Sequence, residues 1–105
     1  MELSKIGFIG GGNMASAIIN GIVSKGMYAY SDIYVSDISQ DRLAHFGGLG
    51  MNTTDDNVAL VKNSDIIVLA IKPNVAEEVL DDIHKYISSE KVVISIMAGW
   101  PTEKL

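Results

Sequence analysis

The stretch IGFIGGGNMA, residues 6–15, decides the fold of this chain. Its first four residues form an apolar run that predicts a short buried strand, and apolar residues recur at helical spacing from Met14 onward. Between strand and helix, Gly10 permits a tight turn, and Gly12 lets the backbone approach a ligand closely. Ala15 is small enough for the helix to pack against the strand. This GxGxxA pattern between a strand and a helix is typical of a turn that binds the phosphates of a dinucleotide.

The alternation of strand and helix continues along the chain. Further apolar runs predict strands at 33–35, 66–71 and 92–96, with helical spacing between them, and a short strand is expected at 51–53, after the glycines that end the second helix. Strands that alternate with helices form a parallel sheet with right-handed crossovers. A chain of 105 residues, 48% of them hydrophobic, is enough for one domain and too short for two. We therefore predict the α/β class: a Rossmann-type doubly wound parallel sheet with strand order 3-2-1-4-5, in a single domain over residues 1–105.

Local signals predict where the other helices begin and end. The glycines of residues 47–50 are expected to break the second helix. Thr54 is expected to cap the third helix, with Asp55 and Asp56 in its first turn, where the helix dipole favours acidic groups. The fourth helix is expected over about 73–87, because a proline at its start suits a first helical turn.

Composition excludes several kinds of function. The net charge of −5 and the pI of about 4.7 argue against nucleic-acid binding, which requires a basic face. Cysteine is absent, which excludes disulfides and thiolate metal sites, and His45 and His84 are too far apart in the sequence to suggest a metal site. The apolar run 66–71 is too short to span a bilayer, and no leader pattern opens the chain. We expect a cytoplasmic protein without bound metal.

Two further segments are expected to meet the glycine turn at the carboxyl edge of the sheet. Asp37 lies at the end of the second strand, 25 residues after Gly12 (37 − 12), where an acid would accept hydrogen bonds from the adenosine ribose. Residues 70–73 end the fourth strand across the switch point from Gly10. The alternative is that the glycines form a plain turn and Asp37 is a surface acid. The Lys72 side chain has two equal interpretations, a cofactor contact or a solvated lysine, and its backbone is the stronger candidate.

The segments GFIGGGNMASAI, VSD, LAIKP and ISIMAGW together resemble the first half of pyrroline-5-carboxylate reductase, an oxidoreductase of proline biosynthesis. The resemblance spans essentially all 105 residues but covers only the cofactor half of that family's enzymes. It implies hydride transfer from NADPH or NADH to the C=N bond of 1-pyrroline-5-carboxylate. The alternatives are the cofactor domain of a hydroxyacid or prephenate-type dehydrogenase, or a nucleotide-binding module without catalytic activity.

The same resemblance implies which residues hold the cofactor, NADP or NAD. Met14 would contribute its backbone N–H, since its side chain is more often core, and Asn57 is alternatively a helix cap. The implied contacts are Ile9, Gly10, Gly11, Gly12, Asn13 and Met14 around the pyrophosphate, Asp37 and Asn57 on the adenosine side, and Ala70, Ile71, Lys72, Pro73 and Ala98 on the nicotinamide side. No catalytic residue can be assigned among the 105 positions.

Two departures from the family pattern change what is expected. Ile38 follows Asp37 where many members carry a polar or basic residue, so a 2′-phosphate would meet a carboxylate without a neighbouring cation. We expect a modest preference for NADH, with NADPH tolerated because Arg42 can reach back. The chain also ends before the helical second domain, which in the family forms the homo-oligomer and the substrate pocket. The 105 residues alone are therefore expected to bind cofactor without reducing the imine.

Overall fold

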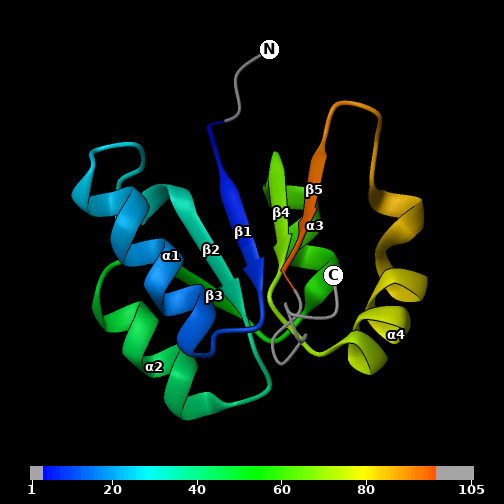
Figure 1. Ribbon diagram of the computed structural model, residues 1–105, viewed down its shortest axis with the longest axis horizontal. Helices are drawn as coiled ribbons and strands as arrows, with labels where there is room; N and C mark the ends of the chain where they lie inside the picture. The colour runs from blue at the N-terminus through cyan, green and yellow to red at the C-terminus, as the bar shows by residue number, and fades with distance from the viewer. Residues whose placement is uncertain (1–3, 97–105) are drawn as a thin grey trace, which may run out of the picture.

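The computed structural model describes residues 4–96, which form a five-stranded parallel sheet between helices (Figure 1). The strand order is β3-β2-β1-β4-β5, as the sequence predicted. In chain order, the elements are β1 (Ile6–Ile9), α1 (Asn13–Ser24), η1 (Tyr30–Asp32), β2 (Ile33–Ser36), α2 (Gln40–Gly48), β3 (Asn52–Thr54), α3 (Asn57–Asn63), β4 (Ile66–Leu69), α4 (Pro73–Ile83), η2 (His84–Tyr86) and β5 (Val92–Ser95).

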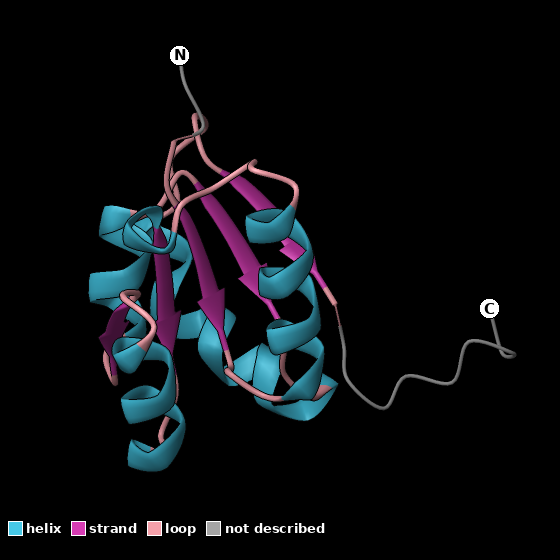
Figure 2. Ribbon diagram, turned by 90° about the vertical axis from the view of Figure 1, so that its left-hand side faces the viewer, coloured by secondary structure: helices cyan, strands magenta, loops and turns pink. Residues whose placement is uncertain are grey.

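Two hydrophobic layers flank the sheet. Alternate residues of β1 point to opposite faces: Phe8 belongs to the cluster with α1 and α2, and Ile9 to the cluster with α3 and α4. Ile19 of α1 packs in the first layer and Leu60 of α3 in the second, and both are fully buried. Figure 2 shows helices in front of the strands and behind them. Strands covered on both faces explain why β1 and β4 are apolar without alternation.

Gly7, in the middle of β1, allows α3 to pack closely against the sheet. A Cβ atom at this position would lie 2.6 Å from Leu60 Cδ2 and would also overlap the Ser64 hydroxyl. The Ser64 hydroxyl is buried and donates to the Leu60 carbonyl at 2.7 Å. The missing side chain therefore sets the distance between β1 and α3.

The second helix ends within the predicted glycines, at Gly48. Gly47 still belongs to α2, where buried Leu43 and Phe46 pack the helix against the sheet. The turn comes later, at Gly50, whose φ of 105° suits only glycine. The strands and the fourth helix lie where expected, with β1 unshifted and the other ends shifted by at most four residues.

The predicted cap of α3 was wrong. Asp56, not Thr54, is the N-cap: its carboxylate accepts from the N–H groups of Val58 and Ala59 at 3.0 and 3.4 Å. Thr54 is the last residue of β3, and its hydroxyl accepts from the Asp56 N–H at 3.0 Å. Asp56 therefore caps the helix, because Thr54 still belongs to β3.

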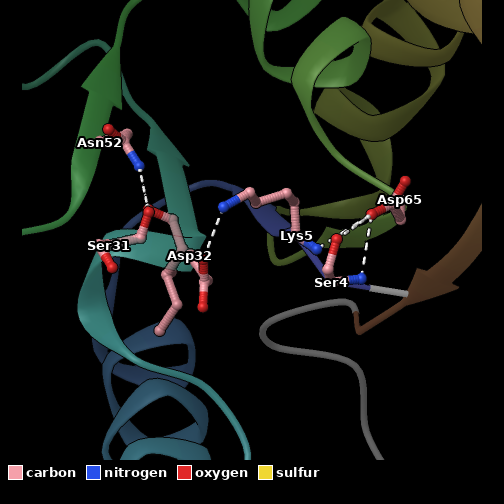
Figure 3. Close-up of polar contacts among 7 residues, drawn as sticks. Ser4, Lys5, Ser31, Asp32, Asn52 and Asp65 are labelled. Atoms are coloured by element: carbon pink, nitrogen blue, oxygen red, sulfur yellow. Dashed lines mark hydrogen bonds and ion pairs between the residues drawn. The ribbon is translucent and has the colours of Figure 1, made fainter. Parts of the chain in front are cut away.

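The amino end of the sheet carries a polar cluster of its own (Figure 3). Lys5 Nζ contacts Asp32 Oδ1 at 2.6 Å, and Asp65 Oδ2 accepts from the N–H groups of Ser4 and Lys5 at 3.1 and 3.0 Å. Asn52 donates to the backbone before β2 at 2.9 Å. These contacts tie four segments together at the edge opposite to the strands' carboxyl ends. Among residues 4–96, no helix has both the length and the apolar character needed to cross a bilayer.

Candidate functional site

The turn after β1 depends on Gly10. Its φ is 100°, and its N–H donates to the Ser36 carbonyl at 2.8 Å, which ties the turn to the end of β2. A Cβ atom there would lie 2.6 Å from the Ala70 carbonyl oxygen and 2.7 Å from Ile71 Cγ2. The predicted tight turn is confirmed, and it also lets the first and fourth strands end side by side.

Gly12 leaves open space at the start of α1. It is the N-cap residue, and a Cβ atom built on it would meet nothing within 4 Å. No side chain of the described part of the chain caps this helix, and its first turn holds no acid. The first intrahelical bond is donated by Ser16, so the N–H groups of Asn13, Met14 and Ala15 have no partner within the helix. Such a helix start binds anions, because the helix dipole and the N–H groups both favour negative charge.

Gly11 packs inward and does not line the cleft. A Cβ atom on it would lie 2.7 Å from Phe46 Cε2 and 3.2 Å from Val35 Cγ1. Its N–H donates to Asp37 Oδ2 at 2.8 Å. Gly11 therefore connects the glycine turn to the acid that follows β2, a role that its place in the sequence did not reveal.

Asp37 is held from three sides. Its carboxylate accepts from the N–H groups of Gly11 and Ser39 at 2.8 and 2.9 Å, and Arg42 Nη1 lies 3.3 Å from Oδ2. Burial of the side chain, which is 6% exposed, would raise the pKa of Asp37. The two backbone donors and the guanidinium outweigh that effect and hold the pKa below its ordinary value. Asp37 is thus a charged acceptor fixed at the end of β2.

A cleft of about 550 Å³ opens at the carboxyl ends of β1, β2 and β4. Most of the predicted contacts lie in it, and Asn13 and Met14 lie beside it in the first turn of α1. The Met14 side chain is 38% exposed, so its interpretation as core was wrong. Pro73 is the first residue of α4, and Ala98 lies outside the described residues. The predicted residues that line the cleft are Ile9, Gly10, Gly12, Asp37, Asn57, Ala70, Ile71 and Lys72.

Lys72 marks the β4 side of the cleft. It is the N-cap of α4, where its carbonyl accepts from the N–H groups of Val75 and Ala76 at 3.0 and 2.9 Å. Its side chain is exposed. The start of α4 therefore fixes the Lys72 backbone at the cleft, whereas its exposed side chain has no such fixed place.

Sequence reasoning missed part of the cleft lining. Ser36 is buried at the end of β2, and its hydroxyl donates to Asn57 Oδ1 at 2.6 Å. The Asn57 side chain is thereby oriented by β2 and is not the cap of α3. Asp55, Val75 and Val79 also line the cleft. A small polar residue ending an apolar strand was the available signal for Ser36, whereas α4 supplies its valines only through tertiary packing.

The arrangement has the chemistry of a dinucleotide site. The start of α1 attracts an anion, Asp37 accepts hydroxyl groups on the β2 side, and a mostly apolar wall of Ile9, Ile71 and Val75 faces them. Among the described cleft residues, Arg42 and Lys72 carry positive charge, one on each side.

Comparison with known proteins gives one family. The model of the family described as NADP oxidoreductase, coenzyme F420-dependent, matches residues 5–99. The pyrroline-5-carboxylate reductase of Methanosarcina acetivorans is 42% identical over 102 residues, covering 96% of this chain and 38% of its own length. The chain thus spans little more than a third of such curated relatives.

Solved structures agree with this. A pyrroline-5-carboxylate reductase from Coxiella burnetii superimposes with a TM-score of 0.83 at 38% identity, over 97% of this chain and 38% of that one. The Plasmodium falciparum pyrroline carboxylate reductase with NADP bound gives 0.77 at 34% identity, over 99% and 37%. The chain is therefore similar to the first part of these proteins along nearly its whole length.

Proposed function

The chain belongs to the family of coenzyme F420-dependent NADP oxidoreductases, and we propose that it is the cofactor-binding part of a pyrroline-5-carboxylate reductase. Its relatives of that name match nearly all of its length, which favours this activity over a hydroxyacid or prephenate-type dehydrogenase. The proposed substrate is a small cyclic imine with a carboxylate, and the product is proline. We further propose that the enzyme works in the cytoplasm and forms a homo-oligomer through regions that its relatives have and these 105 residues do not cover.

One observation carries the proposal: the open space over Gly12 at an uncapped helix start. A pyrophosphate would bind there, because the N–H groups of Asn13 and Met14 have no partner within the helix and no described side chain caps them. Asp37 lies on one side of this point and Lys72 on the other, both lining the same cleft. The adenosine half would then extend toward β2, and the nicotinamide half toward β4.

The residues of this chain would bind the cofactor and orient it. The α1 start would hold the pyrophosphate, and Asp37 would accept a ribose hydroxyl, which fixes the cofactor along the edge of the sheet. The backbone of Ala70 and Ile71 would place the nicotinamide ring on the β4 side of the cleft, where the apolar lining residues Ile9 and Val79 would exclude water from one face. When bound, the dihydronicotinamide supplies a hydride to the imine carbon.

The test is turnover by the protein as its gene encodes it. With 1-pyrroline-5-carboxylate, we expect oxidation of NADPH or NADH and formation of proline. The oxidation is measured as the loss of dihydronicotinamide absorbance. Prephenate and a 2-hydroxyacid, offered with NADP+ or NAD+, serve as control substrates. Turnover of a control substrate without turnover of the imine would contradict the proposal.

The 105 residues by themselves give a second, independent result. We expect them to bind NADPH, measured by its fluorescence, with a dissociation constant in the micromolar range, about −8 kcal/mol. We also expect no turnover of the imine above the uncatalysed rate, because the described cleft residues hold the cofactor and none is assigned to the imine. A rate like that of the complete relatives would contradict this division of roles.

A further inference from the structure

A single guanidinium group lies at the β2 side of the cleft. Arg42 sits in the first turn of α2, where its backbone N–H donates to the Ser39 hydroxyl at 3.3 Å. Its side chain turns back toward β2, lines the cleft and is 56% exposed. Within residues 4–96, its one ion pair is the contact of Nη1 with Asp37 Oδ2 at 3.3 Å.

The Asp37 carboxylate is close to fully occupied. A carboxylate offers about four acceptor positions. Gly11 and Arg42 take those of Oδ2, and Ser39 takes one of Oδ1. One position on Oδ1 remains for a ribose hydroxyl while Arg42 stays in place. If Arg42 leaves, the two backbone donors still hold the carboxylate.

A 2′-phosphate at this position needs a cation that the loop after β2 does not supply. Ile38 directly follows Asp37 and is 94% exposed, but an isoleucine side chain carries no charge. Lys72 follows β4, on the other side of the cleft. Among the described cleft residues, Arg42 is therefore the cation beside Asp37, where the adenosine ribose would bind.

We propose that Arg42 sets the cofactor specificity of this cleft by exchanging partners: it pairs with Asp37 when NADH is bound and with the 2′-phosphate when NADPH is bound. This inference rests on the proposed binding of a nicotinamide dinucleotide. The exchange is feasible because the pair with Asp37 is a single contact of 3.3 Å to a guanidinium group whose side chain is 56% exposed, and the N–H groups of Gly11 and Ser39 still hold the carboxylate when Arg42 leaves. A phosphate offers the guanidinium a stronger, two-pronged contact. The cleft thus accepts both cofactors, although an acid follows β2.

The experiment measures the dissociation constants of NADPH and NADH at fixed ionic strength, for the wild-type chain and for Arg42→Gln, Arg42→Lys and Asp37→Ser. We expect Arg42→Gln to weaken NADPH binding about tenfold or more, because the phosphate then faces Asp37 alone. NADH binding should change less than about threefold, and Arg42→Lys should restore part of the NADPH affinity as a point charge. Asp37→Ser should shift the ratio toward NADPH.

The control is Lys25→Gln, which removes the same charge from the far end of α1, where Lys25 is exposed. It should leave both constants unchanged. If Arg42→Gln keeps the wild-type ratio of the two constants while both nucleotides still bind, the inference about Arg42 is wrong and the proposed function stands. If the wild-type chain binds neither nucleotide, the proposed function itself is contradicted, and this inference with it.

Discussion

Gly10, Gly11 and Gly12 are identical in sequence and differ in what the structure requires of them. Gly10 needs a left-handed backbone and has the Ala70 carbonyl against it. Gly11 has an ordinary backbone, but the Phe46 ring lies where its side chain would be. Gly12 has free space around it. Only Gly12 could carry a side chain without disturbing the fold, so its side of the turn is where a ligand has room.

Gly12→Val is therefore expected to abolish cofactor binding and to leave the domain folded. The valine methyl groups would fill the space that a pyrophosphate requires, and no protein atom within 4 Å of the Cβ position opposes them. Titration with NADPH by fluorescence, together with circular dichroism and thermal unfolding, measures both effects. The matched control is Gly21→Val, further along α1, where a Cβ atom also meets nothing within 4 Å. A folded Gly12→Val variant with wild-type affinity would show that the pyrophosphate does not bind at this turn.

The roles of these residues divide into those that the sequence predicted and those that it could not. The tight turn at Gly10 follows from local pattern, because a glycine between a strand and a helix signals it directly. The packing of Gly11 against Phe46 joins residues 35 positions apart (46 − 11), and no local pattern indicates that contact. The interpretation of Met14 as core was wrong because its position on the helical stripe did not tell how far the sheet extends beneath it.

At the scale of elements, short apolar runs bounded by glycine gave accurate boundaries, and helix ends did not. β1 lies at Ile6–Ile9 as predicted. α2 ends at Gly48, within the predicted glycines, and it includes Gly47 because tertiary packing of Phe46 outweighs the low helix propensity of glycine. The cap of α3 was misplaced by two residues because β3 extends to Thr54, which the sequence left ambiguous.

The close packing of α3 on β1 yields a stability prediction. Gly7→Ala should lower the free energy of unfolding by about 1 to 3 kcal/mol, because the added methyl group overlaps Leu60 and forces α3 away from the sheet. Denaturant unfolding of the two proteins measures the difference. Gly48→Ala is the matched control: it makes the same change in a helix, at a position with free space, and should be neutral or slightly stabilising. Equal stability of wild type and Gly7→Ala would contradict the account of this contact.

At the scale of the whole molecule, the parallel topology separates two tasks at two edges of one sheet. Every strand points the same way, so the turns after β1, β2 and β4 meet at one edge and form the cleft. The opposite edge carries the contacts of Lys5 with Asp32 and of Asp65 with the start of β1. The strand order, and hence the meeting of these turns, followed from the sequence. The contacts that Arg42 and Ser36 make inside the cleft did not, because they depend on side-chain packing between separate elements.

The claim that this edge binds a nicotinamide dinucleotide is tested most directly by nuclear magnetic resonance of the 105-residue chain, labelled with nitrogen-15 and titrated with NADPH. The account predicts that the largest backbone amide shifts fall at Gly10 to Met14, at Asp37 to Ser39 and at Ala70 to Lys72. The amides of Asp32 and Asp65, at the opposite edge of the sheet, should stay unchanged. Shifts centred on that opposite edge, or no shifts at millimolar NADPH, about a thousandfold above the expected dissociation constant, would contradict it.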